Sequence, residues 1–188
     1  QQRWTFTRDG TNAAANITQS GSAVTATSLS TILNISKVSG VVSGDTMFAL
    51  LVMDRNASVT VPSGWTALST QTIGSGKVAL CRRVASSEGS NYTWFFGSSG
   101  NNIIVNTAYR GVATTGTWNT RFDIQNALTS TLNFADTWSA SNDGDQQLQF
   151  VGIMGDYRVT PNASLTEIYD SGLNGAISAF VATRKMTS

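Results

Sequence analysis

The sequence predicts an all-β protein, built as a two-sheet β-sandwich of jelly-roll or Greek-key type with about a dozen strands. Three observations lead to this prediction. No window shows the 3.6-residue hydrophobic period of an amphipathic helix, and turn residues recur every ~8–12 residues between short apolar runs. The run from Met47 to Met53 (MFALLVM) is apolar at every position, which is typical of a strand buried on both faces. A strand and turn pattern that occurs twice indicates two related halves.

The repeated pattern opens at Gly44-Asp45 and again at Gly144-Asp145. In the first copy a turn follows the core strand, and Val61 to Gly64 fits a type I turn with proline second and glycine fourth. The second copy has the same order of core strand, proline turn at Pro161, strand, glycine turn and strand. We therefore expect a single sandwich domain over 21–188, with halves of about 21–112 and 113–188.

Residues 1–20 precede the repeat and contain a short alternating segment. Trp4 and Phe6 alternate with Thr5 and Thr7, as in a strand with one apolar face. The segment is either an outer strand of the domain or an arm that pairs with a neighbouring subunit. We take the arm as the working interpretation.

The remaining strands follow from local composition and from their turns. Tyr92, Trp94 and Phe96 alternate within one short run, so they share a strand face and predict an aromatic core stripe. The expected strands other than 47–53 are one bent or two separate strands in 23–38, then 65–72, 77–85, 92–96, 102–110, 121–124 and 128–138, with the second copy of the repeat running to 185.

Composition excludes several classes of function. The chain has 188 residues, of which 12% are charged, and its formal net charge is +1. Such a weak charge gives no electrostatic attraction to nucleic acid or to an anionic membrane, so we expect neither as a partner. No apolar run approaches the ~18 residues of a membrane span. The polar surface must come from Ser, Thr, Asn, Gln and Gly.

The chain also lacks the side chains that most catalytic sites need. It has no histidine and a single cysteine, Cys81, which excludes zinc sites, Ser-His-Asp triads, Cys-His dyads and any intrachain disulfide. Asn142 to Asp145 is a turn rather than a calcium loop, because the terminal glutamate of such a loop is missing. A pair of carboxylates could make a glycosidase, but no spacing singles one out. We expect no catalytic residue, no cofactor and no metal.

Several short motifs together resemble a known type of domain. They are Pro62-x-Gly64-Trp65-Thr66, Arg83-Val84-Ala85, Tyr92-Thr93-Trp94, Ala108 to Val112 and Phe122-Asp123, with Gly44-Asp45 and Gly144-Asp145 opening the two halves. In this order they resemble a jelly-roll-like β-sandwich domain of structural and adhesion proteins of tailed bacteriophages. The resemblance covers roughly 20–185 and implies a scaffold without catalytic residues. It departs from the pattern at Ser164-Leu165, where Gly-Trp is expected, and before Phe122, where a proline is missing.

The resemblance implies a virion structural protein on the outside of a phage particle, either a capsid-decorating (cement) protein or a tail or fibre component. Its partners would be other virion proteins and further copies of itself, since symmetric oligomers are common among such proteins. A glycan-binding adhesion module of a phage or bacterial surface protein is the alternative. The candidate interaction residues are Trp4 and Phe6 for assembly, and Trp118 and Trp138, near expected loops, for stacking on a host-surface sugar.

Overall fold

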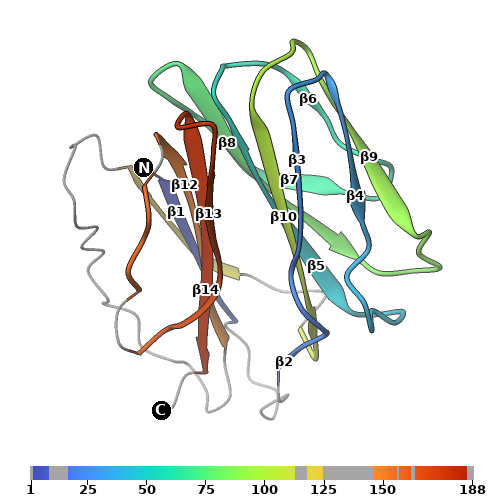
Figure 1. Ribbon diagram of the computed structural model, residues 1–188. Helices are drawn as coiled ribbons and strands as arrows, with labels where there is room; N and C mark the ends of the chain where they lie inside the picture. Colours follow the sequence, from blue (N-terminus) through green and yellow to red (C-terminus); the bar gives the residue numbers. More distant parts are fainter. Residues whose placement is uncertain are drawn as a thin grey trace.

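The computed structural model describes residues 2–8, 17–112, 118–124, 146–155, 157–161 and 164–185. These residues form strands and connections without a helix (Figure 1), so none of them forms a helix that could cross a bilayer. The strands are β1 (Gln2–Arg8), β2 (Thr18–Gln19), β3 (Val24–Ser28), β4 (Ile32–Ser36), β5 (Thr46–Met53), β6 (Val59–Thr60), β7 (Thr66–Ile73), β8 (Gly76–Val84), β9 (Asn91–Phe96), β10 (Asn102–Arg110), β11 (Trp118–Ile124), β12 (Gln146–Met154), β13 (Thr166–Leu173) and β14 (Ile177–Lys185).

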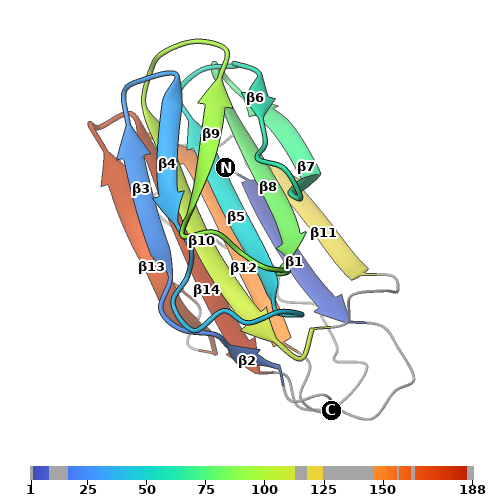
Figure 2. The ribbon, with the colours of Figure 1, turned by 90° about the vertical axis from the view of Figure 1, so that its right-hand side faces the viewer.

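The strands pair into three antiparallel sheets, which stand as layers in Figures 1 and 2. Sheet A has the order β11-β1-β12-β14-β13. Sheet B has the order β10-β5-β8-β7, with β2 and β3 both paired to the outer side of β10, and sheet C has the order β4-β9-β6. The all-β class and the sandwich architecture are confirmed. The third, small sheet was not expected.

Sheet B is the central layer, and its strand β5 is buried on both faces. In β5, the side chains of Phe48, Leu50 and Val52 join the core shared with sheet A. The intervening residues, such as Met47 and Leu51, join the core shared with sheet C. Every residue of β5 is therefore buried, which explains why this run is apolar at each position.

The core between sheets B and C contains the expected aromatic stripe. Tyr92, Trp94 and Phe96 of β9 are buried there, while the residues between them are exposed. Cys81 is also buried in this core. On the far side of sheet A, a smaller cluster buries Val151 and Phe180 of the sheet.

The topology repeats between sheets A and B. In sheet B the strands β5, β7 and β8 occur in that chain order, and β8 lies between the other two. In sheet A the strands β12, β13 and β14 have the same arrangement, with β14 in the middle. Even the register irregularities correspond, because a β-bulge between Ala67 and Ser69 recurs between Glu167 and Tyr169. The two halves are therefore similar in their strand order as well as in their sequence pattern.

The N-terminal strand β1 completes the second half. It lies between β11 and β12 and pairs with both. Since β12 corresponds to β5 of sheet B, β1 occupies the position beside β12 that β10 occupies beside β5. The arm interpretation of residues 1–20 is thereby corrected: residues 2–8 form an internal strand of this chain's own sheet A, and 18–19 pair with β10 in sheet B. An outer strand is not an accurate description either, because β11 lies outside β1.

Two turns show why particular residues are needed. The Trp65 N–H donates to the Pro62 carbonyl over 3.1 Å, and Gly64 has φ of 81°. The turn therefore begins at Pro62, one residue later than expected, and the glycine at its third position is the signature of type II rather than type I. Asn174 and Gly175, both with positive φ, make the turn between β13 and β14, as in a type I′ turn.

Sheets A and B are in close contact at Gly152 of β12. A Cβ atom placed there would lie 2.6 Å from Cγ2 of Val78 and 3.0 Å from Cγ2 of Val52. Both distances are shorter than carbon atoms tolerate, so a side chain at this position would push the sheets apart. Val52 is the residue of β5 that corresponds to Gly152 in the repeat.

Candidate functional site

Of the four residues expected to make contacts, the structure describes Trp4, Phe6 and Trp118, and it places them in two paired strands of sheet A. Trp4 and Phe6 lie in β1, where the register places them opposite Phe150 and Leu148 of β12, whose own side chains are buried between sheets A and B. Trp118 is the first residue of β11, at the edge of sheet A, opposite Arg8. Trp138 lies outside the described residues.

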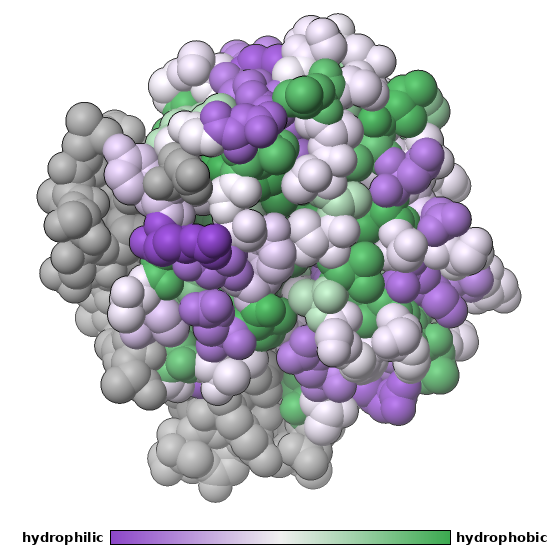
Figure 3. Space-filling model, viewed as in Figure 1, coloured by the Kyte–Doolittle hydropathy of each residue, from purple (hydrophilic) through white to green (hydrophobic). Residues whose placement is uncertain are grey.

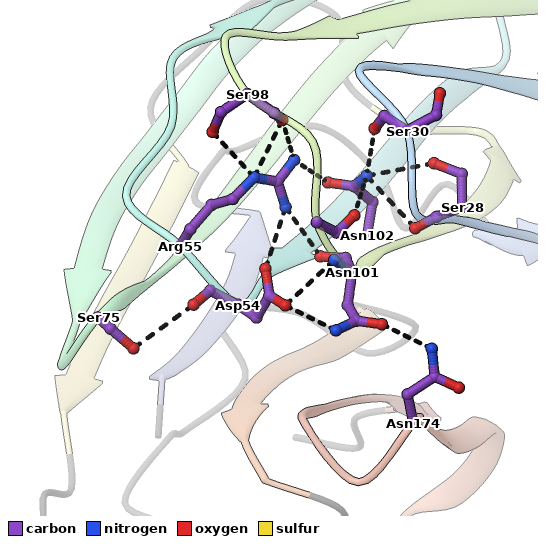
Figure 4. A network of polar contacts seen from close by, with 10 residues as sticks. Ser28, Ser30, Asp54, Arg55, Ser75, Ser98, Asn101, Asn102 and Asn174 are labelled. Carbon is purple, nitrogen blue, oxygen red and sulfur yellow. Dashed lines mark hydrogen bonds and ion pairs between the residues drawn. The ribbon is translucent and has the colours of Figure 1, made fainter.

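A polar cluster joins the loops at one end of the sandwich (Figure 4). We call it the loop clasp and define it as Asp54, Arg55, Ser98, Asn101 and Asn102. The Arg55 guanidinium donates from Nε to the carbonyl (3.0 Å) and hydroxyl (3.1 Å) oxygens of Ser98. Its Nη1 donates to Asp54 Oδ1 at 3.1 Å and to the Asn101 carbonyl at 3.2 Å, and its Nη2 donates to Asn102 Oδ1 at 3.0 Å. One side chain thus holds the loop after β5 against the loop before β10.

The amides of the loop clasp extend these contacts to other strands. Asn102 is fully buried, and its Nδ2 donates to the carbonyls of Ser30 and Gly100, both at 2.9 Å. Asn101 Nδ2 donates to Asp54 Oδ2 at 2.6 Å, while its Oδ1 accepts from Asn174 Nδ2 at 2.7 Å. Because Asn174 belongs to the turn between β13 and β14, this last bond connects sheet A with sheet B.

The electrostatics of the loop clasp keep Asp54 ionised. Burial by itself would raise the pKa of Asp54, but hydrogen bonds from Asn101 and Arg55, together with the Arg55 charge, lower it below the ordinary value. The Arg55 guanidinium also lies over the Phe96 ring, 5.9 Å from its centroid. A carboxylate held in this way accepts hydrogen bonds and does not act as a general acid near neutral pH.

A second cluster surrounds Glu88, in the loop that follows the C-terminal end of β8. Its carboxylate accepts from Arg83 Nε at 2.8 Å, from the Tyr92 hydroxyl at 2.7 Å and from the Ser86 N–H at 2.6 Å. Burial would raise the pKa of Glu88, but these three hydrogen bonds and the Arg83 charge lower it. Burial and the neighbouring Glu88 carboxylate raise the pKa of Tyr92. The cluster secures the loop between β8 and β9 over the edge-to-face pair of Trp65 and Tyr92.

A third ion pair ties the start of β5 to the end of β10. Asp45, 2% exposed, accepts from Arg110 Nε at 3.0 Å and from its Nη2 at 3.1 Å. It also accepts from the Val42 N–H at 3.1 Å. Burial would raise the pKa of Asp45, but these contacts together lower it. Like the other two clusters, this one is a connection between loops and strands.

The described residues contain no group of three or more His, Cys, Asp or Glu side chains that could hold a metal ion. The one thiol is unsuited to chemistry, because burial raises the pKa of Cys81 to about 12. Asp45, Asp54 and Glu88 point into separate clusters, each beside its own arginine. No two of these three carboxylates share a cluster, as the pair of a glycosidase would.

Exposed apolar side chains form a small patch on the outer face of sheet C. Ile32 of β4 and Phe95 of β9 lie directly opposite each other and are 46% and 47% exposed. We call these two residues the sheet C patch. Leu29, in the connection before β4, is 62% exposed as well. On the face shown in Figure 3, green apolar and purple polar residues are interspersed with many pale ones of intermediate hydropathy, as expected for a surface rich in Ser, Thr and Gly.

Sequence reasoning did not find the three clusters. Arg55 and Glu88 look like ordinary turn residues in the sequence, and the partners of Arg55 other than Asp54 lie 43 to 47 residues away. The one available signal is that an Asp-Arg pair follows directly after the most apolar strand, where a charge at the end of a buried strand needs a partner. Comparisons with protein-family models, with curated proteins and with solved structures found no match.

Proposed function

We propose that the protein is a non-enzymatic structural protein on the exterior of a tailed-phage particle. A capsid-decorating (cement) protein is the form that we propose, and a tail or fibre component is the alternative position. The observation that carries the proposal is the state of the three carboxylates described above, each bonded to an arginine that links loops. Polar groups used in this way support a scaffold, and the jelly-roll resemblance in the sequence points to virion proteins.

The sheet C patch supports a role in contact with another protein. Exposed Ile and Phe side chains placed directly opposite each other on a strand pair offer apolar area to a partner, and aromatic residues are enriched at the centres of protein interfaces. The surrounding surface is mostly uncharged, so binding there would depend on shape and apolar contact more than on electrostatic attraction. A capsid or tail protein with a complementary apolar surface is the partner that we propose.

The location of the protein tests this proposal directly. Gold-labelled antibody against the purified protein is applied to phage particles from a culture that expresses the gene, and the particles are imaged by electron microscopy. We expect label over the capsid surface. Label on the tail would establish the alternative position, and unlabelled particles with all of the protein in the soluble fraction would overturn the proposal.

The binding of variants to phage particles then tests the sheet C patch. We expect the double variant Ile32→Ser, Phe95→Ser to lose binding to particles that lack the protein. Ser36→Ala, on the same exposed face of β4, is the matched control and should bind as the wild type does.

A glycan array with Trp118→Ala and Trp138→Ala variants checks the competing function, because specific sugar binding that both substitutions abolish would favour an adhesion module.

A further inference from the structure

The strand β7 is an edge of sheet B with nothing in its sequence to prevent further pairing. In the register it pairs only with β8. Its eight residues (TALSTQTI) include no charged residue and no proline, and five of the eight have exposed side chains. Natural proteins usually protect such an edge with charges, proline or a covering segment, because an open edge offers backbone donors and acceptors to any extended chain.

The other edges among the described strands are protected. The strand β11 includes Arg121 and Asp123, and β13 includes Glu167 and Asp170. The strands β3 and β4 follow each other through a short connection and lie side by side at the corner between sheets B and C (Figure 2). The strand β6 has only two residues. Among these edges, β7 alone is long, uncharged and uncovered by a neighbouring strand.

The internal repeat makes this difference informative. The strands β7 and β13 are equivalent, with the same bulge, and Thr70 in β7 corresponds to Asp170 in β13. The Asp170 side chain is only 7% exposed and accepts from the Val159 N–H, so it has a role in the fold. Glu167 is exposed and corresponds to Ala67 of β7. The same structural unit therefore carries an exposed acidic residue in one edge strand and none in the other.

We propose that β7 pairs antiparallel with β7 of a second copy of this chain, so that sheet B continues across two molecules. A twofold pairing of this kind needs only one surface, and it brings no like charges of the strand together because the strand has none. Pairing with a different protein would instead require an open strand edge on that protein that is complementary to β7. The contact is weak alone, and it becomes effective when copies are held close together on a common surface.

The geometry of the hairpin identifies the backbone groups that would pair. Ile73 and Gly76 flank a two-residue turn at Gly74-Ser75, so they exchange hydrogen bonds with each other. Along an antiparallel strand, successive residues point their backbone N–H and C=O groups alternately toward and away from the partner strand. The groups of Thr72 and Thr70 therefore point away from β8 and toward the open edge. The Thr70 side chain is exposed, so a substitution there alters the edge without disturbing the core.

The test compares molar mass and hydrogen exchange at increasing protein concentration. We expect the wild type to pass from monomer to dimer, with slower amide exchange confined to residues 66–73. Thr70→Pro removes an outward N–H and should abolish the dimer, while Thr70→Val keeps that N–H and should preserve it. Thr70→Asp introduces the residue of the equivalent strand and should also abolish dimerisation, which covers the case in which the proline variant does not fold.

A wild type that stays monomeric at every concentration would overturn the proposal, as would a dimer that survives in both folded Thr70→Pro and Thr70→Asp. Slower exchange at another segment would show that a different surface forms the contact, which would overturn it too. None of these results bears on whether the protein is found on particles. Failure of the self-pairing and failure of the proposed function are thus separate outcomes.

Discussion

Individual polar side chains in this protein act mainly as connectors between distant loops. Arg55 is the clearest case, because its side chain is only 18% exposed and donates to groups of Ser98, Asn101 and Asn102 as well as to Asp54. Charge-assisted hydrogen bonds are the stronger ones, and a partner left unsatisfied after substitution costs free energy in addition. Arg55 therefore contributes more to stability than a surface arginine does.

Substitution of Arg55 tests this contribution. We expect Arg55→Met to lower the free energy of unfolding by about 3 kcal/mol, because Asp54 and Asn102 lose charged partners in a mostly buried site. Arg158→Met is the control, since that side chain is 69% exposed, and its effect should stay within about 0.5 kcal/mol. Urea unfolding followed by tryptophan fluorescence measures both. Equal effects of the two substitutions would contradict the role of the loop clasp.

The buried carboxylates predict how stability depends on pH. The pKa of Glu88 is lowered in the folded protein from its ordinary value of 4.5, so the unfolded state binds protons more tightly. The contribution of Glu88 is then complete above that value and is lost as the pH falls through the lower folded pKa. We expect Glu88→Gln to be less stable than the wild type at neutral pH, with a difference that shrinks in acid. Urea midpoints across a pH series measure it, and a constant difference would contradict the prediction.

Strands differ in how far the sequence alone defines them. The strand β5 could be predicted in both extent and burial, because a run that is apolar at every position needs cover on both faces. The stripe on β9 could also be predicted, from its period of two. The place of β1 could not be, because seven alternating residues contain no information about which strands will flank them. Sheet C and the loop clasp depend in the same way on pairings between distant residues.

The packing of β12 against sheet B gives a prediction for a single added methyl group. We expect Gly152→Ala to lower the free energy of unfolding by about 2 kcal/mol, because the new Cβ atom would overlap the side chains of Val78 and Val52. Gly89→Ala is the matched control, since the nearest atom to a Cβ there is 4.0 Å away. Thermal unfolding measures both variants.

A double variant identifies the cause. Gly152→Ala combined with Val78→Ala should cost less than the sum of the two single substitutions, because the smaller side chain makes room for the added methyl group. Additive costs would show that contact between the sheets is not the reason for the glycine.

The stability of the whole molecule depends on β1, the strand at the N-terminal end of the chain. Because β1 lies between β11 and β12, deleting residues 1–8 removes an internal member of sheet A and not an appendage. We expect the shortened chain to lose about 5 kcal/mol or more, comparable with the whole stability of a domain, and to show no cooperative thermal transition by circular dichroism.

Complementation in trans separates strand loss from general damage. A synthetic peptide of residues 2–8 should restore the cooperative transition of the shortened chain, and a scrambled peptide of the same composition should not. An unchanged melting temperature after the deletion would contradict the placement of β1.

The glycine at position 152 bears on how such a protein can arise. Were two separate, identical chains to associate face to face, the same amino acid would occur at both corresponding positions near their meeting point. Two valines would collide there and two glycines would leave a gap. Within one covalent chain the positions are free to differ, and Val52, together with Val78, fills the space that Gly152 leaves open. Joining the halves thus permits a tight fit that a symmetric pair of subunits could not achieve at this point.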